Sequence, residues 1–166
     1  MAIADRLTDE CETTARMRRA AEGHDIDGVM NTMSDDVVLH SPITDRVVFR
    51  GQQEVREALN AVFSTIRDMH YIADIGSDRT RALFYTARVG RQPLEEGMRL
   101  ELGEDGKISE LTIFYRPLPG LASFAAALAP RVARSRGRVR SVLAWIGMFP
   151  LALATRLGDR LVPWLT

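Results

Sequence analysis

Four strand-like segments follow one another between residues 70 and 117, and this succession limits the folds open to the chain more than any other feature. The runs HYIADIG, RALFYTARVG, LEEGMRLELG and KISELTIFYRP contain many β-branched and aromatic residues. The turn signals SD, RQP and EDG separate them. Consecutive strands joined by short turns predict an antiparallel meander.

The residues before the meander carry helical patterns. Residues 7–22 favour a helix through their Ala, Arg, Glu and Met content. Asp25 is placed to cap a short helix over residues 26–33, and residues 52–69 carry one apolar stripe. A short strand, residues 37–40, lies among these helices. This order predicts an α+β fold in which a bent antiparallel sheet wraps around N-terminal helices.

Prolines and a charge difference divide the chain. Pro117 and Pro119 predict the end of a first domain, residues 1–117, and a helical extension over residues 118–166 follows. The whole chain is neutral, but residues 1–112 have a net charge of −7 and residues 113–166 one of +7. A split of this kind indicates two parts with different surroundings.

The extension combines arginines with an apolar run. Residues 142–154 make an uninterrupted apolar stretch of 13 residues, whereas a helix that spans a bilayer needs about 20. We expect the extension to fold back on the acidic body or on a partner subunit. Peripheral contact with an anionic membrane surface is the alternative. The basic cluster is short and has no interleaved aromatic residues, so nucleic acid is not an expected partner.

Other residue types restrict the chemistry. Cys11 is the one cysteine of the chain, which excludes an internal disulfide and a cysteine-based zinc site. No set of His, Asp and Glu has metal-ligand spacing and no glycine-rich nucleotide-binding pattern occurs. We therefore expect no metal and no other cofactor. The opening MAIADRLTDE lacks the apolar segment of a secretory signal, which makes the cytoplasm the expected location.

Three stretches in order, HDIDGVMNTMSDDVVLHSP, FRGQQEVREAL and EDGKISELTIFYRP, resemble the nuclear transport factor 2 superfamily in its SnoaL-like branch. The resemblance covers about residues 10–117. It implies a cone-shaped α+β barrel that encloses a deep pocket, and a homodimer formed through the outer face of the sheet. Members include ketosteroid isomerase, polyketide cyclases and proteins without catalysis, so the fold leaves the function open.

The family's catalytic positions hold unreactive residues in this chain. By resemblance, the base aspartate of ketosteroid isomerases matches Ser41, the oxyanion-hole tyrosine matches Met17, and the buried neutral acid matches Met98. The histidine and aspartate common in the last strand of SnoaL-like cyclases match Leu111 and Ile113. The resemblance thus implies a chain that lacks the usual catalytic carboxylates and has no ketosteroid isomerase activity.

Strand alternation indicates further side chains of the pocket. If Met98 faces inward, Leu100 does too, and an inward Leu111 places Ile113 and Tyr115 on the same side. An apolar lining with a few polar groups suits a small hydrophobic ligand with a hydroxyl or carbonyl group. The alternative is that these side chains fill a solid core. The expected ligand-binding residues are Met17, Leu39, Leu83, Met98, Leu100, Leu111 and Ile113.

The polar candidates for catalysis are Ser41, Tyr85, Tyr115 and His40. His40 alternates with Ser41, so it faces outward if Ser41 faces inward, unless a bulge at the strand end reverses it. Two functions stay open. The first is a cofactor-independent cyclase, isomerase or hydratase acting on a small hydrophobic carbonyl or hydroxyl compound. The second is a non-catalytic ligand-binding or interaction domain.

Overall fold

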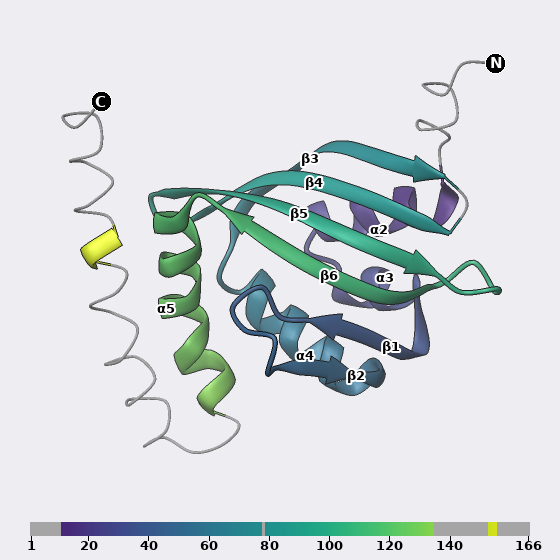
Figure 1. Ribbon diagram of the computed structural model, residues 1–166, viewed down its shortest axis with the longest axis horizontal. Coiled ribbons are helices and arrows are strands. Elements are labelled where there is room, and N and C mark those ends of the chain that lie inside the picture. The colour runs from purple at the N-terminus through teal and green to yellow at the C-terminus, as the bar shows by residue number, and fades with distance from the viewer. Residues whose placement is uncertain (1–10, 78, 135–152, 156–166) are drawn as a thin grey trace.

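The computed structural model describes residues 11–77, 79–134 and 153–155 (Figure 1). Its elements are, in order, α2 (Glu12–Glu22), α3 (Ile26–Met30), β1 (Met33–His40), β2 (Val48–Arg50), α4 (Gly51–Phe63), β3 (Arg67–Ser77), β4 (Thr80–Val89), β5 (Gln92–Leu102), β6 (Ile108–Arg116) and α5 (Leu118–Arg134). None of the described helices is long and apolar enough to span a membrane.

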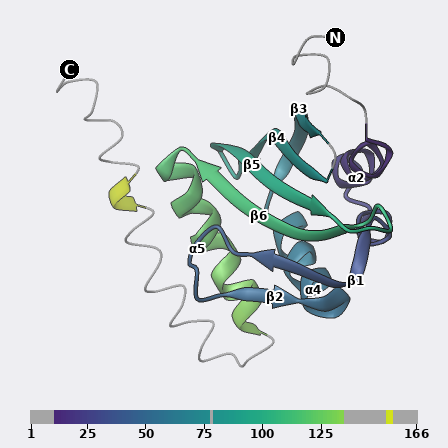
Figure 2. The same ribbon diagram turned by 45° about the vertical axis from the view of Figure 1, so that its right-hand side comes forward.

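The six strands form one curved sheet in the order β2-β1-β6-β5-β4-β3. The predicted meander is confirmed, because β3, β4, β5 and β6 pair antiparallel with their neighbours in the chain. The expectation of an entirely antiparallel sheet needs one correction. β1 pairs with β6 in parallel, and β2 then adds to β1 as the second strand of a short hairpin (Figure 2). The long chain between β1 and β6 makes this parallel pairing accessible.

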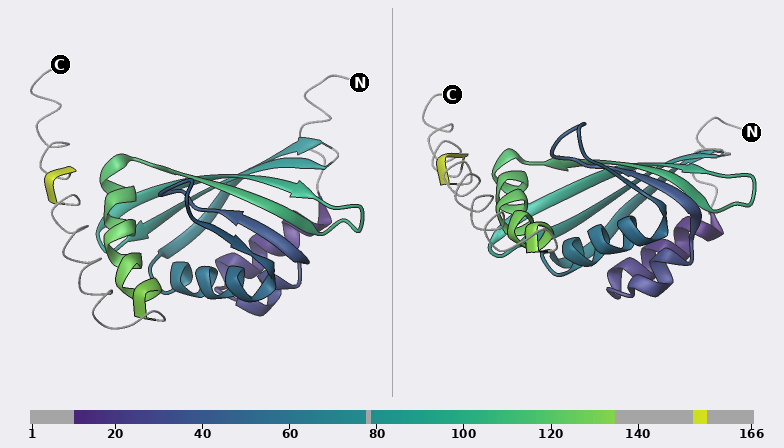
Figure 3. Two further views of the ribbon diagram at one scale, coloured as in Figure 1. Left: turned by 60° about the horizontal axis from the view of Figure 1, so that its bottom comes forward. Right: turned by 90° about the horizontal axis from the view of Figure 1, so that it is seen from below.

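Helices α2, α3 and α4 cover one face of the sheet, which we call the inner face (Figure 3). The hydrophobic core lies between them. Met17 of α2, Met30 of α3 and Val55 of α4 are all buried against inward side chains of the strands, such as Leu83 and Leu100. The α+β cone expected from the sequence is therefore the fold of the protein.

Two helices end earlier than the sequence predicts. Asp25 caps α3 as expected, and its carboxylate accepts a hydrogen bond from the backbone N–H of Gly28 at 3.0 Å. However, α3 ends at Met30, and Met33 already begins β1. α4 ends at Phe63, not at residue 69, because Thr65 bonds its hydroxyl back to a carbonyl of the last turn. Local side-chain bonds of this kind compete with further helical turns.

The final described helix, α5, crosses one end of the sheet (Figure 1). Its residue Phe124 is almost fully buried, and the Phe124 ring lies 4.7 Å from the ring of Tyr115, centroid to centroid. A Cβ atom on Gly120 would lie 2.5 Å from the carbonyl oxygen of Pro93, so the first turn of α5 sits directly on β5. The boundary predicted at residue 117 thus comes just before a helix that packs into the same hydrophobic core as residues 11–117, which we call the body. The arginine-rich and apolar parts of the predicted tail lie outside the described residues, except residues 131–134, which end α5, and residues 153–155.

Candidate functional site

A cavity of about 40 Å³ lies between the helices and the inner face of the sheet. This volume holds a few water molecules at most. Four methionines contribute to its wall, namely Met17, Met33, Met69 and Met98. The inner face is therefore mostly a filled core with a small cavity, an outcome between the two expectations from the sequence.

The one carboxylate in the cavity wall belongs to Glu96 of β5. Glu96 lies directly opposite Tyr85 on β4 and Tyr115 on β6 in the strand register. Facing residues of neighbouring strands share one side of a sheet, so all three side chains point inward. Glu96 is only 3% exposed, and the hydroxyl of Tyr85 donates a hydrogen bond to its Oε2. The sheet thus places an acid between two phenols.

Burial controls the acidity of this group. Desolvation raises the pKa of Glu96 from 4.5 to about 7, although the neighbouring hydroxyls of Tyr115 and Tyr85 favour the charged form and act in the opposite direction. Burial also raises the pKa of Tyr85 and Tyr115 well above 10, and the charge of Glu96 adds to that rise. Both phenols therefore stay protonated while Glu96 changes its charge near neutral pH.

Tyr115 has spare hydrogen-bonding capacity. Its hydroxyl is buried and has no hydrogen-bond partner of standard geometry among the described residues, although it lies close enough to Glu96 to affect its pKa. Buried hydroxyls usually have a partner. This one is available to an oxygen atom of a bound molecule.

A third phenol, Tyr71 of β3, completes the polar part of the wall. Its ring centroid lies 5.1 Å from that of Tyr85. Its pKa is raised well above 10, first by burial and then by the charge of Glu96. The cavity therefore presents one carboxyl group and three neutral phenols on an otherwise apolar wall.

The structure brings together six of the residues that the sequence proposes for the site. Met17, Met98, Leu111, Ile113, Tyr85 and Tyr115 all line the cavity. Leu39, Leu83 and Leu100 are buried in the core but do not contribute to the cavity wall. They face inward as expected, at positions where helix side chains fill the space.

Ser41 and His40 do not reach the cavity, which corrects their expected grouping with the tyrosines. The Ser41 hydroxyl accepts a hydrogen bond from the backbone N–H of Ile43 at 3.2 Å, in the loop after β1. His40 Nε2 lies 2.9 Å from Glu110 Oε1, and both side chains are about two-fifths exposed. β1 is separated from β5 by β6, so its end lies away from Glu96.

Glu96 and Tyr71 are absent from the expected site. The signal for Glu96 was in the sequence, because alternation from an inward Met98 places Glu96 on the same face two residues earlier. The lining expected from the sequence is therefore incomplete. A carboxylate is present, at a position different from those the family resemblance implies. Within the described residues, no group of three or more potential ligands could hold a metal ion.

The family model for the SnoaL-like domain matches residues 14–111, more than half of the chain. The chain therefore belongs to the SnoaL-like domain family. The match runs from α2 into the first half of β6 and includes every residue of the cavity wall except Ile113 and Tyr115. No curated protein matches the chain.

Solved structures with the same fold include proteins with different names. A steroid delta-isomerase from Pseudomonas aeruginosa superposes with a TM-score of 0.68 and 25% identity, over 74% of this chain and 90% of that one. A protein from Silicibacter pomeroyi described as having a cystatin-like fold gives a TM-score of 0.69 and 21% identity, over 81% of this chain and 92% of that one. The epoxide hydrolase/cyclase-like enzyme SalBIII, which has a role in pyran ring formation in the polyether salinomycin, gives a TM-score of 0.50 and 20% identity, over 63% of this chain and 88% of that one. The last two likenesses show the fold alone.

Proposed function

We propose that the protein is a cofactor-independent proton-transfer enzyme of the isomerase, cyclase or hydratase type. Its substrate would be a small hydrophobic compound with a carbonyl or hydroxyl group. The observation that carries this proposal is Glu96, a carboxyl group buried between Tyr85 and Tyr115 at a cavity, with a pKa of about 7. An acid–base catalyst works best when its pKa lies near the working pH, and strongly shifted groups in cavities are candidates for function.

The geometry supports a simple isomerisation. The ionised Glu96 carboxylate removes a proton from a carbon next to the substrate carbonyl. The electron pair of that C–H bond forms a C=C bond, and the π pair of the C=O bond moves to the carbonyl oxygen. The free hydroxyl of Tyr115 donates a hydrogen bond to the oxygen as it gains negative charge. The protonated Glu96 then returns the proton to another carbon or to the oxygen. Tyr85, whose hydroxyl bonds Oε2, holds the carboxyl group in place.

The steroid delta-isomerase among the similar structures supports acid–base chemistry but not the same reaction. In this chain the positions that match the isomerase residues hold Ser41, Met17 and Met98. Glu96 would therefore act from a different place on the inner face. We expect no efficient steroid isomerisation, and a standard steroid isomerase assay checks this.

Deuterium exchange into small ketones tests the proposal without knowledge of the natural substrate. The purified protein is incubated in D₂O with cyclopentanone, cyclohexanone and cyclohex-2-enone, and loss of the α-proton signals is followed by NMR. We expect exchange above background, reduced at least about a hundredfold by Glu96→Gln. Tyr115→Phe should reduce it at least about tenfold, because the oxygen loses its donor.

Glu101→Gln serves as the matched control. Glu101 lies on the same strand and accepts a hydrogen bond from Thr80 at 2.7 Å, but it does not line the cavity. Exchange at the wild-type rate in Glu96→Gln, or at the background rate with every ketone in the wild type, would contradict the proposal. The second function, a non-catalytic binding domain, predicts the latter result.

We also propose that the protein acts as a homodimer, in the cytoplasm. The support is the outer face of the sheet, where Phe84, Phe114 and Ile72 are between 40% and 61% exposed. They line a groove of about 340 Å³. Exposed apolar patches on a sheet commonly mark an interface.

A further inference from the structure

Two buried side-chain polar atoms have no hydrogen-bond partner within the described part of the chain. One is the hydroxyl of Tyr115, which belongs to the proposed reaction centre. The other is Nε of Arg18, on α2, which the proposed reaction does not use. A buried donor without an acceptor costs free energy, and each such atom in a native protein calls for an explanation.

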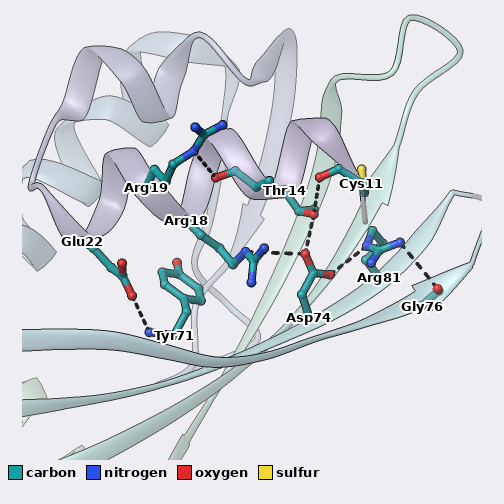
Figure 4. A network of polar contacts seen from close by, with 10 residues as sticks. Cys11, Thr14, Arg18, Arg19, Glu22, Tyr71, Asp74, Gly76 and Arg81 are labelled. Carbon is teal, nitrogen blue, oxygen red and sulfur yellow. Dashed lines mark hydrogen bonds and ion pairs between the residues drawn. The ribbon is translucent and has the colours of Figure 1, made fainter. Parts of the chain in front are cut away.

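The carboxylate nearest to Arg18 is already engaged by other donors (Figure 4). Asp74 Oδ1 accepts a hydrogen bond from Arg81 Nε at 2.8 Å, and Asp74 Oδ2 accepts one from the hydroxyl of Thr14 at 2.6 Å. Arg18 Nε forms an ion pair with Oδ2 at 3.6 Å, a distance longer than that of a hydrogen bond. Both oxygens of Asp74 therefore accept hydrogen bonds from other residues, and Nε of Arg18 makes no hydrogen bond to this carboxylate.

A second acid near Arg18 is also engaged. Glu22 lies one turn further along α2. Its Oε1 accepts a hydrogen bond from the backbone N–H of Tyr71 at 2.7 Å and lies 3.4 Å from Nδ1 of His70. Glu22 thus ties α2 to β3 and leaves Arg18 without a hydrogen-bonded acidic partner.

Arg18 does not line the cavity itself, but it lies beside Tyr71, which does. Most residues of the cavity wall are buried, but Val62, Phe63 and Tyr71 are only half-buried. These three residues lie at the end of α4 and in the first half of β3 and form a more exposed part of the cavity wall. We call them the mouth. Tyr115 is also half-buried, but α5 covers its ring. Figure 4 shows the guanidinium of Arg18 beside the ring of Tyr71, on the side toward Asp74.

We propose that the ligand of the cavity is a small apolar carboxylic acid, whose carboxylate binds Arg18 at the mouth while its apolar body enters the cavity. The Nε–H and one Nη–H of a guanidinium point in the same direction and match the two oxygens of a carboxylate. The four methionines of the wall are flexible enough to rearrange around an apolar chain. This inference rests on the ligand-binding cavity of the proposed function but not on the chemistry of Glu96.

A pair of probes of equal shape tests the role of the charge. Hexanoate and hexanamide are each titrated into the full-length protein at pH 6, and backbone amide shifts are followed by NMR. We expect hexanoate to bind at least about tenfold more tightly than hexanamide, with shifts at Tyr71, Phe63 and Met98. A charge-assisted hydrogen bond of ordinary strength gives at least this ratio.

Arginine variants on one helix assign the preference to a side chain. Arg18→Met keeps an apolar stem and should abolish the preference for hexanoate. Arg18→Lys keeps the charge but loses the planar pair of donors, and should retain only part of the preference. Arg16→Met is the matched control, because Arg16 is an exposed residue of α2 paired with Glu12 at 4.0 Å. It should bind both probes as the wild type does.

The outcomes separate this inference from the proposed reaction. Glu96→Gln should keep the hexanoate preference, even if it abolishes ketone exchange. Equal affinities for the two probes in the wild type, or an unchanged preference in a folded Arg18→Met variant, would overturn the inference. So would hexanoate shifts confined to residues away from the mouth and the cavity.

Discussion

At the scale of single residues, Glu96 is governed by a competition between burial and hydrogen bonding. Taking a carboxylate out of water favours its neutral form, whereas phenol donors favour its charged form. Burial is the larger effect, because the pKa of Glu96 is raised to about 7 although Tyr85 donates to it. A residue balanced in this way can give and accept a proton at the same pH, and its ionisation must also affect folding.

The pH dependence of stability tests the raised pKa. The folded protein holds the Glu96 proton up to about pH 7, whereas the unfolded chain loses it near pH 4.5. The folded state binds more protons between these values, so stability falls as pH rises through this window. The difference corresponds to about 3 kcal/mol above pH 7. We expect Glu96→Gln to be more stable than the wild type at pH 8 and to lose this part of the pH dependence in urea unfolding.

Glu101→Gln is the control for that measurement. Glu101 lies on the same strand, with a side chain 34% exposed and 3.6 Å from Nε of Arg99. Its variant should follow the wild-type pH profile. A Glu96→Gln protein that parallels the wild type from pH 5 to pH 8 would show that Glu96 titrates in its ordinary range.

Single residues also show what the sequence can and cannot predict. Alternation along β5 is regular, so an inward Met98 is enough to place Glu96. On β3, the register shifts between Tyr71 and Ala73, so that both Tyr71 and Asp74 face α2 although they are three residues apart. A bulge of this kind breaks the period of two and leaves no clear sign in the sequence.

At the scale of elements, α5 shows how packing extends a domain beyond a sequence boundary. Pro117 and Pro119, which the sequence analysis takes as the end of the first domain, come directly after β6, and residues 118–134 form the helix α5. Whether that helix packs on the body depends on the shape of the open end of the sheet, which composition does not reveal. Gly120, where a side chain would meet β5, is the local feature that allows the close approach.

Removing the Phe124 ring tests how much α5 contributes to the body. Phe124 is 1% exposed and packs on Tyr115. We expect Phe124→Ala to lower the free energy of unfolding by about 3–5 kcal/mol, because a large buried side chain leaves a cavity. Urea unfolding followed by circular dichroism measures this. Leu118→Ala is the control on the same helix, since Leu118 is 62% exposed. A loss below about 1 kcal/mol in Phe124→Ala would mean that α5 contributes little to the stability of the body.

At the scale of the whole molecule, the two faces of the sheet differ in what covers them. The inner face carries the core and the cavity. On the outer face, Phe84, Gly97 and Phe114 lie side by side on three neighbouring strands. The missing side chain of Gly97 leaves a trough that the ring of Phe84 partly fills, because a Cβ atom at Gly97 would lie 3.0 Å from Cε1 of Phe84. The rim carries both charges, with Arg116 and Glu95 at 3.2 Å, and a patch with both signs can pair with its own copy around a two-fold axis.

A charged residue in that trough tests the proposed homodimer. Phe114 is 59% exposed, so Phe114→Asp should leave the fold intact, as judged by circular dichroism. In a dimer the new carboxylates would be buried opposite apolar groups without partners, which costs several kcal/mol. We therefore expect sedimentation equilibrium at micromolar concentration to give twice the 18.5 kDa chain mass for the wild type and the single mass for the variant. Ile43→Asp, at an exposed residue in the loop after β1, should remain dimeric. A wild-type protein that sediments as a monomer would exclude the dimer, and a variant that stays dimeric would move the interface away from this face.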